Sequence, residues 1–169
     1  MQWVLIILLS VGAFALSGYL KNRKKNELAS KGRYVERGNE FFKQGHYFFT
    51  KTCDFSAIAG AIDKNALSEE KISYEPSIGQ GQIVFHNMIS FGSFGARLRY
   101  LGQREQDGLH AYSFQVEAWR DGQYGITRQD LYGANALLTL IEKAFLWLDP
   151  ATEVQRAAAE YRSKMFCRG

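Results

Sequence analysis

Apolar residues follow three patterns along this chain. The first is an unbroken run from Trp3 to Leu20 that contains no charged residue. The second is strict alternation of apolar and polar positions, which is typical of half-buried strands, and the third is apolar positions spaced three and four apart, which is typical of helices. The chain therefore divides into an apolar leading segment and a mixed body.

The leading run predicts a helix that crosses a membrane. From Gln2 it spans 19 residues, or about 28 Å at about 1.5 Å per residue, close to the roughly 30 Å of a hydrocarbon core. Trp3 and Tyr19 lie near its ends, where amphipathic rings favour the membrane interface. We expect residues 1–20 to form a transmembrane anchor.

Two alternatives to an anchor remain open. Ala13-Phe14-Ala15 has the small-residue pattern of a signal-peptide cleavage site, although no basic residue precedes the apolar run. A buried helix of a soluble protein is disfavoured, because a charge-free run of this length suits lipid better than a core.

Basic residues follow the run immediately, at Lys21, Arg23, Lys24 and Lys25. Residues 21–37 hold seven basic and two acidic residues, a net charge of +5, whereas residues 38–169 hold 14 basic and 15 acidic residues, a net charge of −1. Because positive loops stay on the cytoplasmic side, we expect an N-terminus outside and a cytoplasmic body. These residues set topology, and a second interpretation is that they attract anionic lipid.

The body, residues 46–169, follows a basic juxtamembrane connector at 21–45 that is interrupted by glycines. Strands are predicted at 46–52, 82–91, 94–101, 110–119 and 123–128, with helices at 57–67, 134–148 and 150–165 and a short extended piece at 71–74. Asp149-Pro150 offers an N-cap and a first-turn proline to the last helix.

Alternation also fixes the expected strand register, since a slip by one residue moves every side chain to the other face. A turn at 104–108 aligns Leu98 with Phe114, and Tyr100 with Tyr112. A three-residue loop at 120–122 pairs Val116 with Ile126. We therefore predict an α+β domain with an antiparallel sheet of about five strands, covered on one face by helices, in the order β-α-β4-α-α. This order resembles that of helix-grip and TATA-binding-protein-like folds, as an analogy of topology alone.

Composition and charge exclude several classes of protein. Apolar residues make up 46% of the chain and aromatic residues 14%, which excludes a disordered chain. Two cysteines exclude a disulfide scaffold. Nucleic acid is not an expected partner, because the basic excess belongs to the connector and not to the body.

Candidate catalytic residues do not form a recognisable constellation. The histidines His46, His86 and His110 lack metal-ligand spacing, and the lone thiol of Cys53 has no base that the sequence identifies. The acidic residues Asp54, Asp63, Glu69 and Glu70 are expected on loops or helix surfaces. We expect no catalytic residue, no cofactor and no metal.

A polar surface has two interpretations, a recognition surface for a partner and a solvent-facing ladder of opposite-charge cross-strand pairs. Arg97, Arg99 and Glu117 are predicted, with Ser113 and Gln115, on the outer face of two neighbouring strands. Trp119 and Trp147 are better candidates for contact with a partner, because large aromatic residues are enriched at interaction hot spots, and a core position is the alternative for Trp147.

These patterns favour a single-pass membrane protein whose cytoplasmic α+β domain binds a protein partner or ligand without catalysis. One alternative is an enzyme or small-ligand carrier with a cleft between the sheet and the C-terminal helix. Another is an exported domain released after signal cleavage.

Overall fold

The computed structural model describes residues 2–38, 40, 42, 44–87, 94–119, 121–122 and 125–158, without the side chains of residues 2–14, 21, 121, 122, 125 and 158. The chain divides into two compact units, residues 1–35 and 36–169. The elements are α1 (Gln2–Ser30), β1 (Gln44–Thr50), α2 (Phe55–Ala61), α3 (Lys64–Glu69), β2 (Ile72–Ser77), the 3-10 turn η2 (Ile78–Gln80), β3 (Gln82–Asn87), β4 (Gly95–Gln103), β5 (His110–Ala118), β6 (Asp121–Gly122), β7 (Gly125–Ile126), α4 (Arg128–Leu148) and β8 (Glu153–Ala158).

The first unit contains helix α1, which ends in a glycine cap. Gly32 adopts a left-handed conformation with φ 64°. Its amide donates to the carbonyl of Ala29 at 2.9 Å, and the amide of Arg33 donates to the carbonyl of Leu28 at 2.8 Å. This pair of hydrogen bonds satisfies carbonyls that a helix end leaves without partners.

Within the part of the structure whose side chains are described, no helix combines the length and the apolar content that a bilayer crossing requires.

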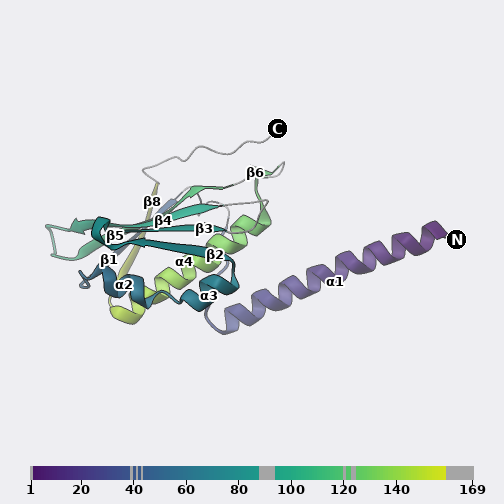
Figure 1. The fold of residues 1–169 in the computed structure, drawn as a ribbon, viewed down its shortest axis with the longest axis horizontal. Coiled ribbons are helices and arrows are strands. Elements are labelled where there is room, and N and C mark those ends of the chain that lie inside the picture. Colours follow the sequence, from purple (N-terminus) through teal and green to yellow (C-terminus); the bar gives the residue numbers. More distant parts are fainter. Residues whose placement is uncertain are drawn as a thin grey trace. The chain divides into compact units, whose positions relative to one another are not determined.

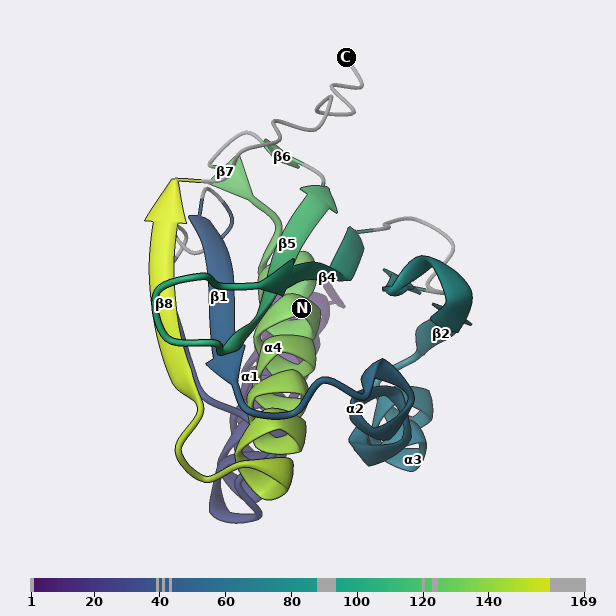
Figure 2. The same ribbon diagram turned by 90° about the vertical axis from the view of Figure 1, so that its left-hand side faces the viewer.

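The second unit is an α+β domain built on an open antiparallel sheet. Its described strands pair in the order β2-β3-β4-β5-β1-β8, and β6 and β7 form a separate two-stranded ribbon. Figures 1 and 2 show α2, α3 and α4 together on one side of this sheet, with α4 running across it. The predicted α+β class and antiparallel sheet are confirmed, and the described strands of the sheet number six where the sequence predicted about five. The predicted order β-α-β4-α-α is wrong, because two helices follow β1 and the last described element is a strand.

Strand register in the middle of the sheet follows the predicted alternation. Leu98 pairs with Phe114 and Tyr100 with Tyr112, which confirms the predicted hairpin. The other predicted pairing is wrong, because Ile126 pairs with Asp121 in the small ribbon and not with Val116. Residues 121 and 122, which were expected in a loop, therefore form β6, and the described part of the strand expected at 123–128 pairs with β6 instead of extending the sheet.

Aromatic side chains fill the space between α4 and the sheet. Phe145 of α4 stacks on Phe48 of β1, with ring centroids 4.4 Å apart and ring planes within 5°. The ring of Tyr112 lies 5.1 Å from Phe145 and 5.0 Å from Tyr100. Phe48, Tyr112 and Phe145 are all at most 1% exposed, so the interface between helix and sheet is a packed core.

The last predicted helix is instead strand β8, over the residues that the structure describes. Its six residues pair antiparallel with β1, with Arg156 opposite His46 and Val154 opposite Phe48. Asp149 does not start a helix there. It accepts hydrogen bonds from the hydroxyl of Thr50 at 2.8 Å and the amide of Lys51 at 2.9 Å, which ties the end of α4 to the end of β1. The predicted stretch beyond Ala158 lies outside the described residues.

The boundaries of the other predicted helices differ from those observed, because capping residues start helices at other positions. The segment expected as one helix at 57–67 forms α2 and α3, because the side chain of Asp63 accepts from the amide of Ala66 and starts a new helix. Helix α4 begins at Arg128, six residues before the predicted start. Thr127 caps it by accepting from the amide of Asp130, in the Thr-x-x-Asp spacing of an N-terminal cap.

Pro76 lies within β2, an edge strand of the sheet, where its missing amide is tolerated.

We expect Gly133→Ala to destabilise the domain, although alanine is the better helix former. A Cβ at Gly133 meets Cε1 of the fully buried Phe94 at 2.7 Å, so the ring must shift. Overpacking of this kind costs about 1–3 kcal/mol. Gly60 of α2 is the matched control, because nothing lies within 4 Å of the position that a Cβ would take there. At that position alanine is expected to be neutral or to stabilise by up to about 1 kcal/mol.

Denaturant unfolding of the full chain in detergent, followed by tryptophan fluorescence, measures both changes. Equal stability of the Gly133→Ala and Gly60→Ala proteins contradicts the proposed close contact with Phe94.

Candidate functional site

The predicted polar residues lie side by side on the sheet face opposite the helices of the second unit. On β4 and β5, Arg97 pairs with Gln115 and Arg99 with Ser113. Between them Leu98 and Phe114, both fully buried, point to the helix-covered side. Since successive side chains alternate between faces, the polar set occupies the side that α2, α3 and α4 leave open.

Glu117 lies at the centre of this surface, between two arginines. Nη2 of Arg97 lies 2.9 Å from one of its carboxylate oxygens, and Nη2 of Arg99 lies 3.1 Å from the other. Nη1 of Arg97 also donates to Oε1 of Gln82 on the next strand at 3.3 Å. We call Gln82, Arg97, Arg99 and Glu117 the arginine patch; its formal charge is +1.

The exposure of the two arginine side chains indicates how much the patch contributes to stability. The side chain of Arg99 is 44% exposed and that of Arg97 30% exposed. Ion pairs at such positions contribute about 0–1 kcal/mol to stability. The patch therefore adds little to the fold, while its guanidinium groups remain accessible to a carboxylate from outside.

The two predicted tryptophans lie in different surroundings. Trp119 packs against the core, with its ring edge-on to Phe42 at a centroid distance of 5.7 Å. Trp147, near the end of α4, is 76% exposed, and Leu146 beside it is 44% exposed. Trp147 is therefore available to a partner, whereas Trp119 is partly buried. The side chain of Trp3 lies outside the described residues.

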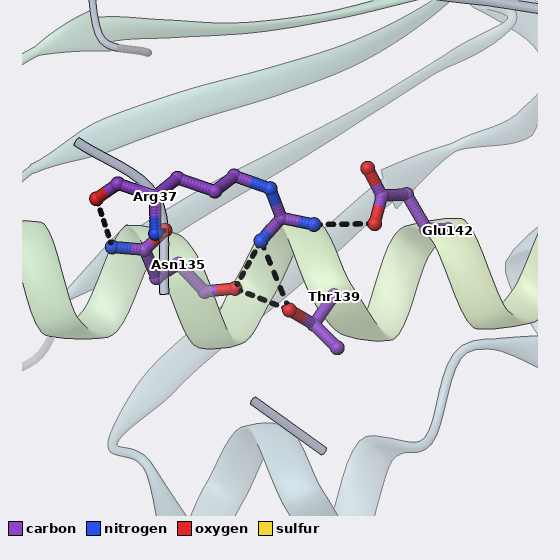
Figure 3. Close-up of polar contacts among 4 residues, drawn as sticks. All are labelled: Arg37, Asn135, Thr139 and Glu142. Carbon is purple, nitrogen blue, oxygen red and sulfur yellow. Dashed lines mark hydrogen bonds and ion pairs between the residues drawn. The ribbon is translucent and has the colours of Figure 1, made fainter. Parts of the chain in front are cut away.

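A second polar cluster, which the sequence analysis missed, joins Arg37 to α4 (Figure 3). The amide of Arg37 donates to Oδ1 of Asn135 at 3.0 Å, and its Nη1 donates to the hydroxyl of Thr139 at 3.1 Å and to the carbonyl of Asn135 at 3.3 Å. Its Nη2 forms an ion pair with Glu142. These bonds connect residues about 100 positions apart in the chain.

This Arg37 cluster is largely removed from water. The side chain of Arg37 is 7% exposed and that of Glu142 20% exposed. Burial raises the pKa of Glu142, and the charge of the Arg37 guanidinium opposes that rise. The spacing of Asn135, Thr139 and Glu142, at i, i+4 and i+7, was the available signal, because it places a polar stripe on an otherwise apolar helix.

Several of the other candidates contact neighbouring groups in the fold. Asp54 and Asp63 act as the N-caps of α2 and α3. His110 shares a 2.8 Å hydrogen bond with the hydroxyl of Tyr100. Cys53 is an exposed free thiol. Among the described side chains, no group of three His, Cys, Asp or Glu residues could hold a metal ion.

No family model, curated protein or solved structure matches this chain.

Removing Arg37 should destabilise the domain far more than removing an arginine of the patch. Arg37→Met removes the cation that is hydrogen-bonded to the partly buried Glu142 and leaves only the weaker influence of Arg156, and breaking such a pair costs about 3 kcal/mol. Arg99→Met, the matched control, should cost at most about 1 kcal/mol. Replacing both partners, as Arg37→Met with Glu142→Met, should recover part of the loss, because no buried charge remains.

Urea unfolding of the three variants and the parent in one detergent measures these differences. The interpretation of the Arg37 cluster fails if Arg37→Met costs no more than Arg99→Met.

Proposed function

We propose that this chain is a single-pass membrane protein whose cytoplasmic α+β domain binds a protein partner through the open face of its sheet. The charge-free run from Trp3 to Leu20 and the cluster of basic residues after it support the anchor and its orientation. Helix α1 continues from this run through the basic residues to Ser30 without a break.

The observation that carries the binding function is the contrast between the two faces of the sheet. The helices α2, α3 and α4 cover one face (Figure 2), and buried rings such as Phe48, Tyr112 and Phe145 fill the space between these helices and the sheet. The opposite face holds the arginine patch. A packed interior favours contact at the surface over a ligand held between helix and sheet, so the patch is the place where we expect a partner.

The chemistry of the patch indicates the kind of partner. Two guanidinium groups share the single carboxylate of Glu117, which leaves N–H donors directed at other acceptors. Arginine donors match carboxylates in a planar, bidentate geometry. We therefore expect the partner to present aspartate or glutamate side chains to this face, with Trp147 as a separate aromatic contact point.

A photo-crosslinking amino acid at Gln115, next to the patch, should capture one specific protein in intact cells. The same amino acid at Asn65, exposed on α3, should not capture it. Arg97→Gln with Arg99→Gln should reduce the Gln115 adduct at least tenfold, because the loss of even one charge-assisted hydrogen bond costs about 1.5 kcal/mol or more. Lys64→Gln with Lys71→Gln, on the helix side, is the matched control for lost charge.

Two results would contradict this proposal. One is the same adducts from Asn65 as from Gln115, and the other is a Gln115 adduct that the arginine substitutions leave unchanged.

The anchor is tested separately by reporters fused to the C-terminus. A reporter that functions only in the cytoplasm should be active, one that functions only after export should be inactive, and alkaline carbonate should leave the full-length chain in the membrane. An active exported reporter, or a mature chain that begins just after Ala15, would instead establish an exported domain.

A further inference from the structure

The length of α1 determines where its basic residues lie relative to the apolar run. Because the helix is continuous to Ser30, each residue beyond Leu20 adds about 1.5 Å along one axis. Lys25 then lies about 7.5 Å beyond Leu20, and Lys31 about 16 Å beyond it. The headgroup layer on each side of a bilayer is only about 5–7 Å thick.

This spacing separates the basic residues into two groups. Lys21, Arg23, Lys24 and Lys25 fall within or at the edge of a headgroup layer, and we call them the basic collar. Lys31 falls well beyond that layer, and so does the backbone of Arg33, because its amide donates to the carbonyl of Leu28, a residue about 12 Å beyond Leu20. The two groups differ in depth, although both belong to the positive segment that sets topology.

The single acidic residue in the sequence between positions 21 and 35 is paired with the outer group. A carboxylate oxygen of Glu27 lies 2.6 Å from Nζ of Lys31, and this hydrogen bond lowers the pKa of Glu27. Lys31, directly after the end of α1, therefore has an anionic partner one turn back, and the charge of Arg23 also acts on Glu27. Arg23 and Lys24 are exposed on the part of the helix nearer the apolar run, and Nζ of Lys25 lies 5.4 Å from the centre of the Tyr34 ring.

We propose that the basic collar binds the anionic headgroups of phospholipids. This inference rests on the proposed membrane anchor and adds to it the class of lipid that surrounds the helix. Cationic side chains beside a spanning helix attract anionic lipid within a Debye length of the surface. If the basic residues served only to orient the anchor, the protein would not select one lipid over another.

The test uses the full chain reconstituted into vesicles of phosphatidylcholine with a minor fraction of phosphatidylglycerol. Spin-labelled phosphatidylglycerol and spin-labelled phosphatidylcholine report which lipid is immobilised at the protein. Wild type should enrich phosphatidylglycerol several-fold over phosphatidylcholine, and high salt should weaken the enrichment. Changing all four collar residues to Gln should bring the ratio close to one.

The matched control is Lys31→Gln with Arg33→Gln, which removes positive charge outside the headgroup layer and should keep most of the enrichment. Equal immobilisation of both lipids by wild type overturns the proposal, as does an equal loss in the control and collar variants. Flotation of the vesicles in alkaline carbonate is measured first. A chain that separates from the vesicles there overturns the anchor as well, whereas a chain that floats without lipid preference overturns only the collar.

Discussion

The second unit depends on the burial of a single apolar sheet face beneath α4. Phe145 is the central contact, because it stacks on Phe48 of β1 and lies against Tyr112 of β5. Burying side chains of this size stabilises a domain by about 1.5–3 kcal/mol each. Since one face takes all of this burial, the alternation of each strand directs its polar side chains to the opposite face. The arginine patch is thus a direct consequence of how the core is packed.

The sequence predicts elements well where local pattern and burial agree. Alternation around Leu98 and Phe114 specifies both face and register, since a slip would bury Arg97 or Arg99. Prediction from the sequence fails where pairing with a distant strand overrides the local preference for a helix. Residues 153–158 contain good helix formers, yet they form β8 because β1 offers backbone groups along its edge and Asp149 turns the chain back towards it. That partner lies about 100 residues away, beyond any local pattern.

The same distinction applies to the two polar clusters. Arg97, Arg99 and Glu117 lie on neighbouring strands joined by a short hairpin. The alternation of side chains between the two faces is therefore enough to bring them together. Asn135, Thr139 and Glu142 form a polar stripe that is visible on α4, but nothing near them in sequence identifies Arg37 as the residue that covers it. The prediction of a surface site is therefore easier than that of a buried one, because a buried polar group requires a partner whose position depends on the whole fold.

The two ion-pair sites have opposite energetics, and this difference suggests different reasons for their presence. In the buried pair of Arg37 and Glu142 the charge attraction offsets only part of the cost of desolvation, which is why the pKa of Glu142 stays raised, so the pair offers no large gain over apolar packing. The pair fixes the position of residue 37 along α4. The bonds that Arg37 makes to Asn135, Thr139 and Glu142 are compatible with only that position. The exposed patch contributes neither much stability nor a fixed register, since the strand ladder already sets β4 against β5. The fold does not need this array of two arginines and one glutamate for its stability, and this is the basis for the contact outside the chain that we propose for it.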